Sequence, residues 1–156
     1  MKKLKVLICS TYIPPFAGGA EQVAWETARL LSKIKDLEVH ILTTGKVGTE
    51  LKENILIHKI PNLFAKEILY STIYYNLLDN IIKKNDFDVI HSHISLPWGY
   101  IFRNFKGKKI ITLHDFKKKD FLRMYFFKQA IKKADLLTAP SKWLANRIKK
   151  NYRLDC

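Results

Sequence analysis

The chain has 156 residues, of which 47% are hydrophobic and 27% are charged, and its formal net charge at pH 7 is +14. These totals fit one globular domain that buries roughly 70% of the surface of its unfolded chain, and they exclude a disordered protein. No apolar run approaches the ~20 residues of a membrane-spanning helix. The brief apolar run after the basic start is not a secretory signal.

The positive charge is concentrated in the last third of the chain. Residues 103–156 contain sixteen lysines and arginines and four aspartates, whereas residues 1–102 contain twelve basic and ten acidic residues. A surface that is basic on one side attracts the phosphates of a nucleotide, a nucleic acid or an anionic membrane. Lysines that serve solubility produce the same composition, so the charge by itself selects no partner.

The chain is organised around the stretch Lys5–Ala28, which is predicted to form a strand, a glycine loop and a helix. Residues 6–9 are consecutive apolar residues, as in a strand buried on both faces. Two prolines then keep the chain extended, and Gly18 and Gly19 permit a tight turn into a helix with apolar residues at helical spacing. The unpaired N–H groups at such a helix start can bind an anion or a sugar hydroxyl. A glycine turn without a ligand is equally compatible with this stretch.

The rest of the chain alternates between predicted strands and helices. Further strands are expected at residues 38–43, 55–60, 88–93, 109–114 and 136–139. Helices are expected at residues 20–34, 66–84, 96–105, 120–133 and after Ser141. The hydroxyl of Ser141 is a suitable N-cap. The polar residues 44–54 are expected to form a loop.

This alternation predicts an α/β fold with a doubly wound, Rossmann-like parallel sheet of about six strands in a single domain. Right-handed crossovers favour the strand order 3-2-1-4-5-6. Strands one and four are then neighbours, and a crevice opens at their carboxyl ends. The glycine loop, His93 and the pair His114-Asp115 follow strands at this edge, so we expect them to converge on one cleft.

The histidines differ in where the predicted strands place them. His40 and His58 lie inside strands and are expected to be surface or hydrogen-bonded core residues, and His91 shares a sheet face with His93. His93 and His114 stand at strand ends, where each is either a site residue or a group that holds its own loop. The His-x-His pair lacks a third ligand at suitable spacing, so no metal site is expected.

Several catalytic motifs are absent from the sequence. The glycine loop has neither the G-x-G-x-x-G pattern of dinucleotide-binding folds nor the G-K-[ST] of a P-loop. There is no G-x-S-x-G motif, and Cys9 lies in a predicted buried strand, so nucleophilic hydrolysis is disfavoured. Because Cys156 is the last residue, we expect no structural disulfide, and this cysteine usage fits a reducing cytoplasm.

Five stretches resemble, in order, the amino-terminal domain of retaining GT-B glycosyltransferases of family 4. They are STYIPPFAGGAEQVAWETARLLSK, EVHILT, DVIHSHISLP, ITLHD and ADLLTAPSKWLANRI, within residues 3–150. The P-P-x-x-G-G-x-E element is the most specific. The resemblance implies half of a GT-B fold, in which two Rossmann-like domains face each other across a cleft. The second domain binds the nucleotide sugar, and the first mainly holds the acceptor.

The resemblance also implies roles for individual residues. Substrate-binding roles fall to Gly18, Gly19, Glu21, His93 and Asp115. The two glycines would approach the donor diphosphate and the transferred sugar, and His93 would line the acceptor side. His114 would be the catalytic residue beside that sugar. The family needs no metal or other cofactor beyond the nucleotide diphosphate sugar that is the donor substrate, and placement and electrostatics serve its oxocarbenium-like transition state.

The sequence departs from the family because the donor-binding second domain is absent from residues 1–156. We therefore expect the acceptor-side half of a transferase that moves a glycosyl group to a hydroxyl with retention. We expect it to be inactive without a donor-binding domain or subunit. A truncated gene, an excised domain and one half of a split enzyme all remain open.

Two other functions remain open at this stage. A non-catalytic carbohydrate or lipid-phosphate binding subunit would have the same cleft without the chemistry. A nucleic-acid-binding module fits the net charge, but the sequence lacks a helix-turn-helix, zinc-ligand spacing or an exposed aromatic strand. The basic, aromatic segment 116–133 is either a core helix with lysines at its ends or a contact with an anionic bilayer that presents a lipid-linked acceptor. Such a contact would place the protein at the inner face of the membrane.

Overall fold

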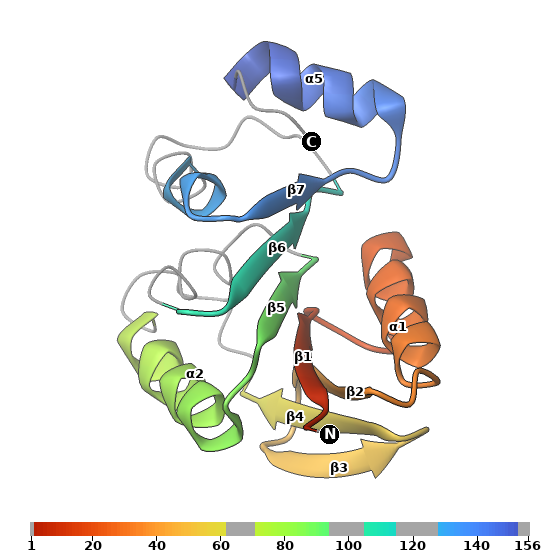
Figure 1. Ribbon diagram of the computed structural model, residues 1–156, viewed down its shortest axis with the longest axis vertical. Helices are drawn as coiled ribbons and strands as arrows, with labels where there is room; N and C mark the ends of the chain where they lie inside the picture. The colour runs from red at the N-terminus through yellow and green to blue at the C-terminus, as the bar shows by residue number, and fades with distance from the viewer. Residues whose placement is uncertain (1, 62–70, 94–104, 115–127, 153–156) are drawn as a thin grey trace. The chain divides into compact units, whose positions relative to one another are not determined.

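The computed structural model describes residues 2–61, 71–93, 105–114 and 128–152, and the structural statements below concern these ranges. The chain divides into two compact units, Met1–Val89 and Ile90–Cys156, and each unit is described by itself. Figure 1 shows the strands and helices alternating along the chain.

The seven strands form one sheet in the order β3-β4-β2-β1-β5-β6-β7. Their bounds are Leu4–Cys9 for β1, Leu37–Thr44 for β2, Gly48–Lys52 for β3, Ile55–Ile60 for β4, Val89–Ser92 for β5, Lys108–Thr112 for β6 and Leu136–Thr138 for β7. The pairs β1–β2, β2–β4 and β6–β7 are parallel. The predicted α/β class and the order of the six predicted strands are therefore confirmed.

Strand β3 corrects the expectation that residues 44–54 form a loop. It pairs antiparallel with β4 through a two-residue turn at Glu53 and Asn54, whose φ angles are 51° and 62°. Positive φ at both central residues is typical of a hairpin turn that matches the twist of the strands. All five residues of β3 are exposed, so no apolar alternation indicates the strand in the sequence.

Three helices have described bounds, which are Gly19–Leu31 for α1, Ser71–Asn85 for α2 and Lys142–Tyr152 for α5. Residues 128–132 are also helical. Ser141 caps α5 as predicted, because its hydroxyl accepts the N–H of Leu144 at 3.2 Å. The helix expected at 96–105 lies almost wholly outside the described residues, as does the first part of the helix expected at 120–133.

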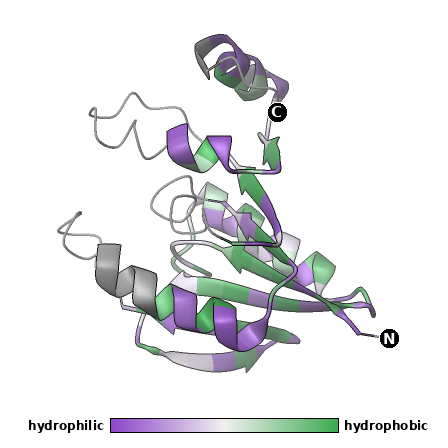
Figure 2. Ribbon diagram, turned by 60° about the vertical axis from the view of Figure 1, so that its left-hand side comes forward, coloured by the Kyte–Doolittle hydropathy of each residue, from purple (hydrophilic) through white to green (hydrophobic). Residues whose placement is uncertain are grey.

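Each unit has its own apolar core. In the first unit, α1 and α2 lie on opposite sides of β1 (Figure 1). Trp25 and Ala28 of α1 pack against β1, β2 and β4, whose core residues are Val6, Ile8, Val39, Ile41, Ile55 and Ile57. In the second unit, Leu144 and Ile148 of α5 pack with Ile111 and other core residues of β6, β7 and the helical residues 128–132. Figure 2 shows hydrophobic residues along the strands and mixed residues on the helices, as expected for helices that cover a sheet.

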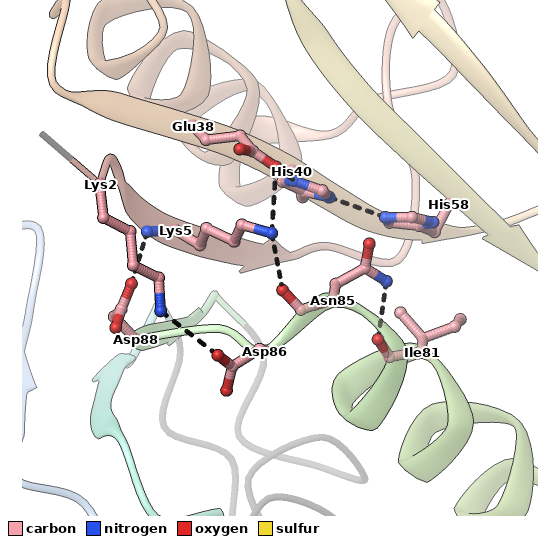
Figure 3. Close-up of polar contacts among 9 residues, drawn as sticks. All are labelled: Lys2, Lys5, Glu38, His40, His58, Ile81, Asn85, Asp86 and Asp88. Carbon is pink, nitrogen blue, oxygen red and sulfur yellow. Dashed lines mark hydrogen bonds and ion pairs between the residues drawn. The ribbon is translucent and has the colours of Figure 1, made fainter.

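Aspartates that precede two strands attach them to the starts of neighbouring strands. Asp88, before β5, accepts the Lys5 N–H of β1 on its carboxylate at 2.8 Å and donates its own N–H to the Lys5 carbonyl at 2.9 Å. Asp135, before β7, makes the same two bonds with Lys109 of β6, at 2.9 and 2.8 Å. The Lys109 N–H is also the main reason that the pKa of Asp135 is lowered. Figure 3 shows the Asp88 arrangement.

A chain of hydrogen bonds runs through the sheet from Glu38 to Thr49 (Figure 3, which ends at His58). Glu38 contacts His40 Nε2 at 2.8 Å, His40 Nδ1 contacts His58 Nε2 at 2.9 Å, and His58 Nδ1 contacts the Thr49 hydroxyl at 3.4 Å. His40 and His58 are 1% and 6% exposed. They are therefore the hydrogen-bonded core histidines that the sequence allowed.

The carboxylate of Asp88 is predicted to stabilise the fold. Replacing it in Asp88→Ala leaves the Lys5 N–H without its acceptor, so we expect the free energy of unfolding to fall by roughly 1–2 kcal/mol. The control is Asp86→Asn, which removes an exposed ion pair with Lys2 and keeps a residue that tolerates the positive φ of this position. Urea denaturation of both variants measures the difference, and equal stability of the two variants would contradict the assignment.

The buried pair of His40 and His58 predicts that the protein loses stability in acid. Burial, and then the nearby charges of His40 and Lys84, lower the pKa of His58 to about 4. Between about pH 6.5 and pH 4 the unfolded chain therefore binds a proton that the folded chain refuses, so stability falls as the pH falls through this window. His58→Gln keeps a hydrogen-bonding group but does not titrate. We expect it to lose less stability between pH 7 and pH 5 than the parent chain does, by on the order of 1 kcal/mol. Urea midpoints at the two pH values test this, and an equal loss in both proteins would contradict it.

Candidate functional site

The glycine loop between β1 and α1 is tied at its start to the end of β2. The carbonyl of Thr11 accepts the Thr43 hydroxyl at 3.0 Å, the Thr44 hydroxyl at 2.7 Å and the Thr44 N–H at 3.1 Å. The Ser10 hydroxyl donates to the Tyr12 carbonyl at 2.9 Å. Sequence analysis did not single out these residues, although two threonines at the end of a buried strand are a visible signal. The strand end thus holds the loop in place.

Gly18 and Gly19 stand where α1 begins. Gly18 is the N-cap, with φ −80° and ψ −172°, and it supplies no side-chain cap to the helix. A Cβ at Gly18 would lie 2.9 Å from the Glu21 carboxylate, whereas a Cβ at Gly19 would meet no described atom within 4 Å. Neither glycine has a positive φ, so the backbone here is one that other residues also adopt. The backbone conformation by itself therefore requires glycine at neither position.

Two further features lie beside the glycines. Glu21 is the acidic residue of the first turn of α1, where a carboxylate is favourable because of the helix dipole. Phe16, which sequence analysis did not single out, is 83% exposed within the loop. An exposed aromatic ring offers a flat apolar surface, and the backbone of the loop beside it offers hydrogen-bonding groups. The loop thus combines unpaired helix-start N–H groups with an exposed ring.

In the second unit the structure brings together two histidines singled out from the sequence. His93 directly follows β5 and His114 follows β6, and His93 Nδ1 lies 3.1 Å from His114 Nε2. The two rings are stacked, with centroids 5.3 Å apart, and the ring of His91 lies 4.3 Å from that of His93. Asp115 lies outside the described residues.

A second set of hydrogen bonds crosses β5, β6 and β7. His91 Nε2 lies 2.7 Å from the Thr112 hydroxyl, which lies 2.7 Å from the Thr138 hydroxyl. These contacts link β5, β6 and β7 through side chains. His91 is therefore a hydrogen-bonded histidine whose ring flanks the pair of His93 and His114.

Burial keeps His91 and His93 neutral. His93 is 4% exposed, and burial, assisted by His91 and His114, lowers its pKa to about 3. Burial and then His114 lower the pKa of His91 to about 4. Among the described residues, His93 Nε2 is buried without a hydrogen-bond partner. His93 therefore contacts His114 from a buried position.

The described ranges contain no cluster of three or more histidine, cysteine, aspartate or glutamate side chains arranged to hold a metal ion. Burial raises the pKa of the Cys9 thiol well above its usual value, which disfavours the thiolate that a nucleophile needs. No helix of the described ranges has the length and apolar character needed to cross a membrane.

The glycine loop belongs to the first unit and the histidine cluster to the second. Their convergence on one cleft, expected from the sequence, stays a prediction.

Relatives of known sequence or structure are glycosyltransferases or share this fold. The chain is 32% identical over 159 residues to an uncharacterized glycosyltransferase of Methanocaldococcus jannaschii, and the match covers 96% of this chain and 44% of that protein. The chain thus spans less than half the length of this relative.

Two solved structures have a similar fold. Sucrose-phosphate synthase from Thermosynechococcus elongatus superposes with a TM-score of 0.64 at 11% identity, over 95% of this chain and 82% of that one. An alpha-glucosyltransferase in complex with UDP and a 13-mer DNA superposes with a TM-score of 0.50 at 13% identity, over 88% of this chain and 38% of that one.

The model of Glycosyltransferase Family 4 matches residues 17–156. This match covers most of the chain and includes Gly18, His93 and His114. The chain therefore belongs to Glycosyltransferase Family 4.

Proposed function

We propose that this chain is the acceptor-side half of a retaining glycosyltransferase, which moves a glycosyl group from a nucleotide diphosphate sugar to a hydroxyl acceptor. The proposal rests on family membership and on one observation, which is the open space in front of Gly19 at the start of α1. No described part of the fold uses this space, which leaves room for a bound molecule to approach the backbone closely.

The start of α1 suits the diphosphate of such a donor. The first N–H groups of a helix have no partner within the helix and carry a partial positive charge, which attracts anions. Gly18 adds no side chain that would compete for these groups. Gly19 allows a phosphate or the transferred sugar to approach the backbone closely. Glu21, one turn further, is suited to accept hydrogen bonds from sugar hydroxyls.

His114 is proposed as the catalytic residue beside the transferred sugar, with His93 and Asp115 nearby on the acceptor side. A neutral imidazole can exchange hydrogen bonds with hydroxyl groups without adding charge. The transition state of glycosyl transfer carries positive charge on the sugar ring, so a neutral ring is better placed there than a cation. The proposed reaction needs no metal ion or other cofactor.

The proposal includes a partner that supplies most of the donor site. The chain spans 44% of its Methanocaldococcus relative, and in the resemblance the second domain binds the nucleotide sugar. The partner is a donor-binding domain or subunit. Without it, residues 1–156 would hold the acceptor and part of the donor.

The basic second unit supports a contact with an anionic membrane that carries the acceptor. Residues 128–152 expose seven basic side chains and one acidic one, Asp135. The basic residues are Lys128, Lys132, Lys133, Lys142, Arg147, Lys149 and Lys150. Trp143 is 66% exposed on the same helix as the last four, and tryptophan with lysine and arginine is typical of surfaces that lie on lipid headgroups. Much of the segment 116–133 lies outside the described residues.

The proposal predicts where ligands bind on the isolated chain. Titration of the ¹⁵N-labelled chain with uridine and guanosine diphosphate sugars should shift amide signals of residues 17–21. Titration with simple sugars as acceptor analogues should shift signals near His93 and His114. Weak binding suffices, because shift mapping detects millimolar affinities. Shifts confined to other parts of the chain would contradict the proposed site.

Turnover by the isolated chain is predicted to be negligible. The proposed donor site is incomplete within residues 1–156, so release of nucleoside diphosphate from any of these donors should stay at the level of a buffer control. Strong transfer by the purified chain would contradict the need for a donor-binding partner.

Substitutions at Gly19 test its role in folding and its role in ligand binding separately. Because a Cβ at this position meets open space, Gly19→Ala should leave stability unchanged or raise it by up to about 1 kcal/mol. Gly19→Trp should fold but abolish the donor-induced shifts, because the indole fills the space proposed for the ligand. Gly48→Trp, at a glycine of β3 that is also open, is the matched control and should retain the shifts. Equal donor binding by both tryptophan variants would contradict the role of Gly19.

A further inference from the structure

The two histidine pairs of this protein have the same internal contact but differ in their surroundings. In both, Nδ1 of one ring lies within hydrogen-bond distance of Nε2 of the other, at 2.9 Å for His40 and His58 and at 3.1 Å for His93 and His114. Every ring nitrogen of the first pair has a partner, because Glu38 and Thr49 complete it. The second pair leaves His93 Nε2 buried and unpartnered among the described residues.

An unpartnered nitrogen costs stability, so packing by itself does not explain His93. A buried polar atom without a partner is destabilising by roughly 1–3 kcal/mol. An apolar ring of similar shape would avoid this cost. A polar group that is retained at a cost to stability points to a role in function. The contact that His93 does make is with His114.

The surroundings of the pair favour one position for the proton of His114. In a neutral pair, one ring donates and the other accepts. If His114 Nε2 donated, the proton of His93 would sit on Nε2 as a buried N–H without an acceptor. If His93 Nδ1 donates, Nε2 is left as an unpaired acceptor, which buried sites tolerate more readily than an unpaired donor. The second arrangement makes His114 Nε2 an acceptor, so the proton of His114 sits on Nδ1.

We propose that His93 is a positioning residue, which donates a hydrogen bond from Nδ1 to His114 Nε2 and so holds His114 in one orientation with its proton on Nδ1. His91 supports this arrangement, because its ring lies against His93 while its Nε2 is engaged by Thr112. The assignment replaces the expectation of a direct acceptor contact for His93. Its relevance to transfer rests on the proposed function of His114.

For catalysis, the consequence is that His114 would present an N–H from Nδ1. A defined tautomer offers a substrate oxygen a hydrogen-bond donor in a fixed place, with no reorganisation during the reaction. Without His93, Nε2 of His114 would lose the donor that favours the Nδ1-protonated tautomer. The loss would therefore appear in the rate of transfer by the complete enzyme rather than in folding.

Long-range ¹H–¹⁵N spectra of imidazole rings test the assignment on this chain without any turnover. At pH 7 the His114 ring of the parent chain should show a protonated Nδ1 and an unprotonated Nε2. In His93→Phe the share of the Nδ1-protonated form should fall, because Nε2 of His114 loses the donor that held it as an acceptor. His93→Asn, whose carboxamide can occupy the place of Nδ1 and donate, should restore the parent pattern.

Two comparisons separate the hydrogen bond from a general disturbance of the unit. His91→Phe keeps an aromatic ring against His93 and should leave the His114 tautomer unchanged. Urea denaturation of His93→Phe should show stability equal to or above that of the parent, because the unpartnered nitrogen is gone. A purely structural His93 would instead lower stability and leave the tautomer as it was.

The parent spectrum alone can overturn the proposal, because an Nε2-protonated His114 in the unaltered chain contradicts it whatever the variants do. An unchanged tautomer in a folded His93→Phe chain also contradicts it. If the tautomer responds as expected but donor and acceptor titrations show no binding near His114, the positioning role stands and the proposed function fails.

Discussion

Parallel strands end on the same edge of a sheet, and this constraint positions the polar contacts of the candidate site. In the first unit, β1 and β2 run in register from Leu4 and Leu37 to Cys9 and Leu42. The residues that follow them therefore meet, and Thr43 and Thr44 hold the carbonyl of Thr11. In the second unit, the residues after β5 and β6 meet in the same way, as His93 and His114. Side chains that meet this way come from strands that are far apart in the chain.

The same sheet contains two histidine pairs with different surroundings. His40 and His58 form a closed chain with Glu38 and Thr49, in which every nitrogen has a partner, as buried polar groups require. His93 and His114 form a similar contact near the strand ends but leave one nitrogen without a partner in the described residues. Folding explains the satisfied pair, whereas the incomplete pair carries the proposed role of His93 in positioning His114.

The structure adds information about the two glycines that the sequence motif does not contain. In the sequence, Gly18 and Gly19 are equally compatible with a tight turn and with a ligand site. In the structure neither adopts a positive φ, and the space in front of Gly19 is open. The backbone conformation does not need glycine there, and the open space is compatible with a bound molecule.

The sequence by itself determined the α/β class, the order of six strands, the cap at Ser141 and the family. These follow from local signals, namely buried apolar runs, helical spacing and motifs of adjacent residues. It did not reveal β3, whose residues are all exposed, because an edge strand paired on one side needs no apolar pattern. Only the tertiary structure decided that His93 is buried against His114 and that Gly19 faces open space. Both depend on which residues lie across from each other on separate strands or loops, and no local pattern records distances between segments that are remote in the chain.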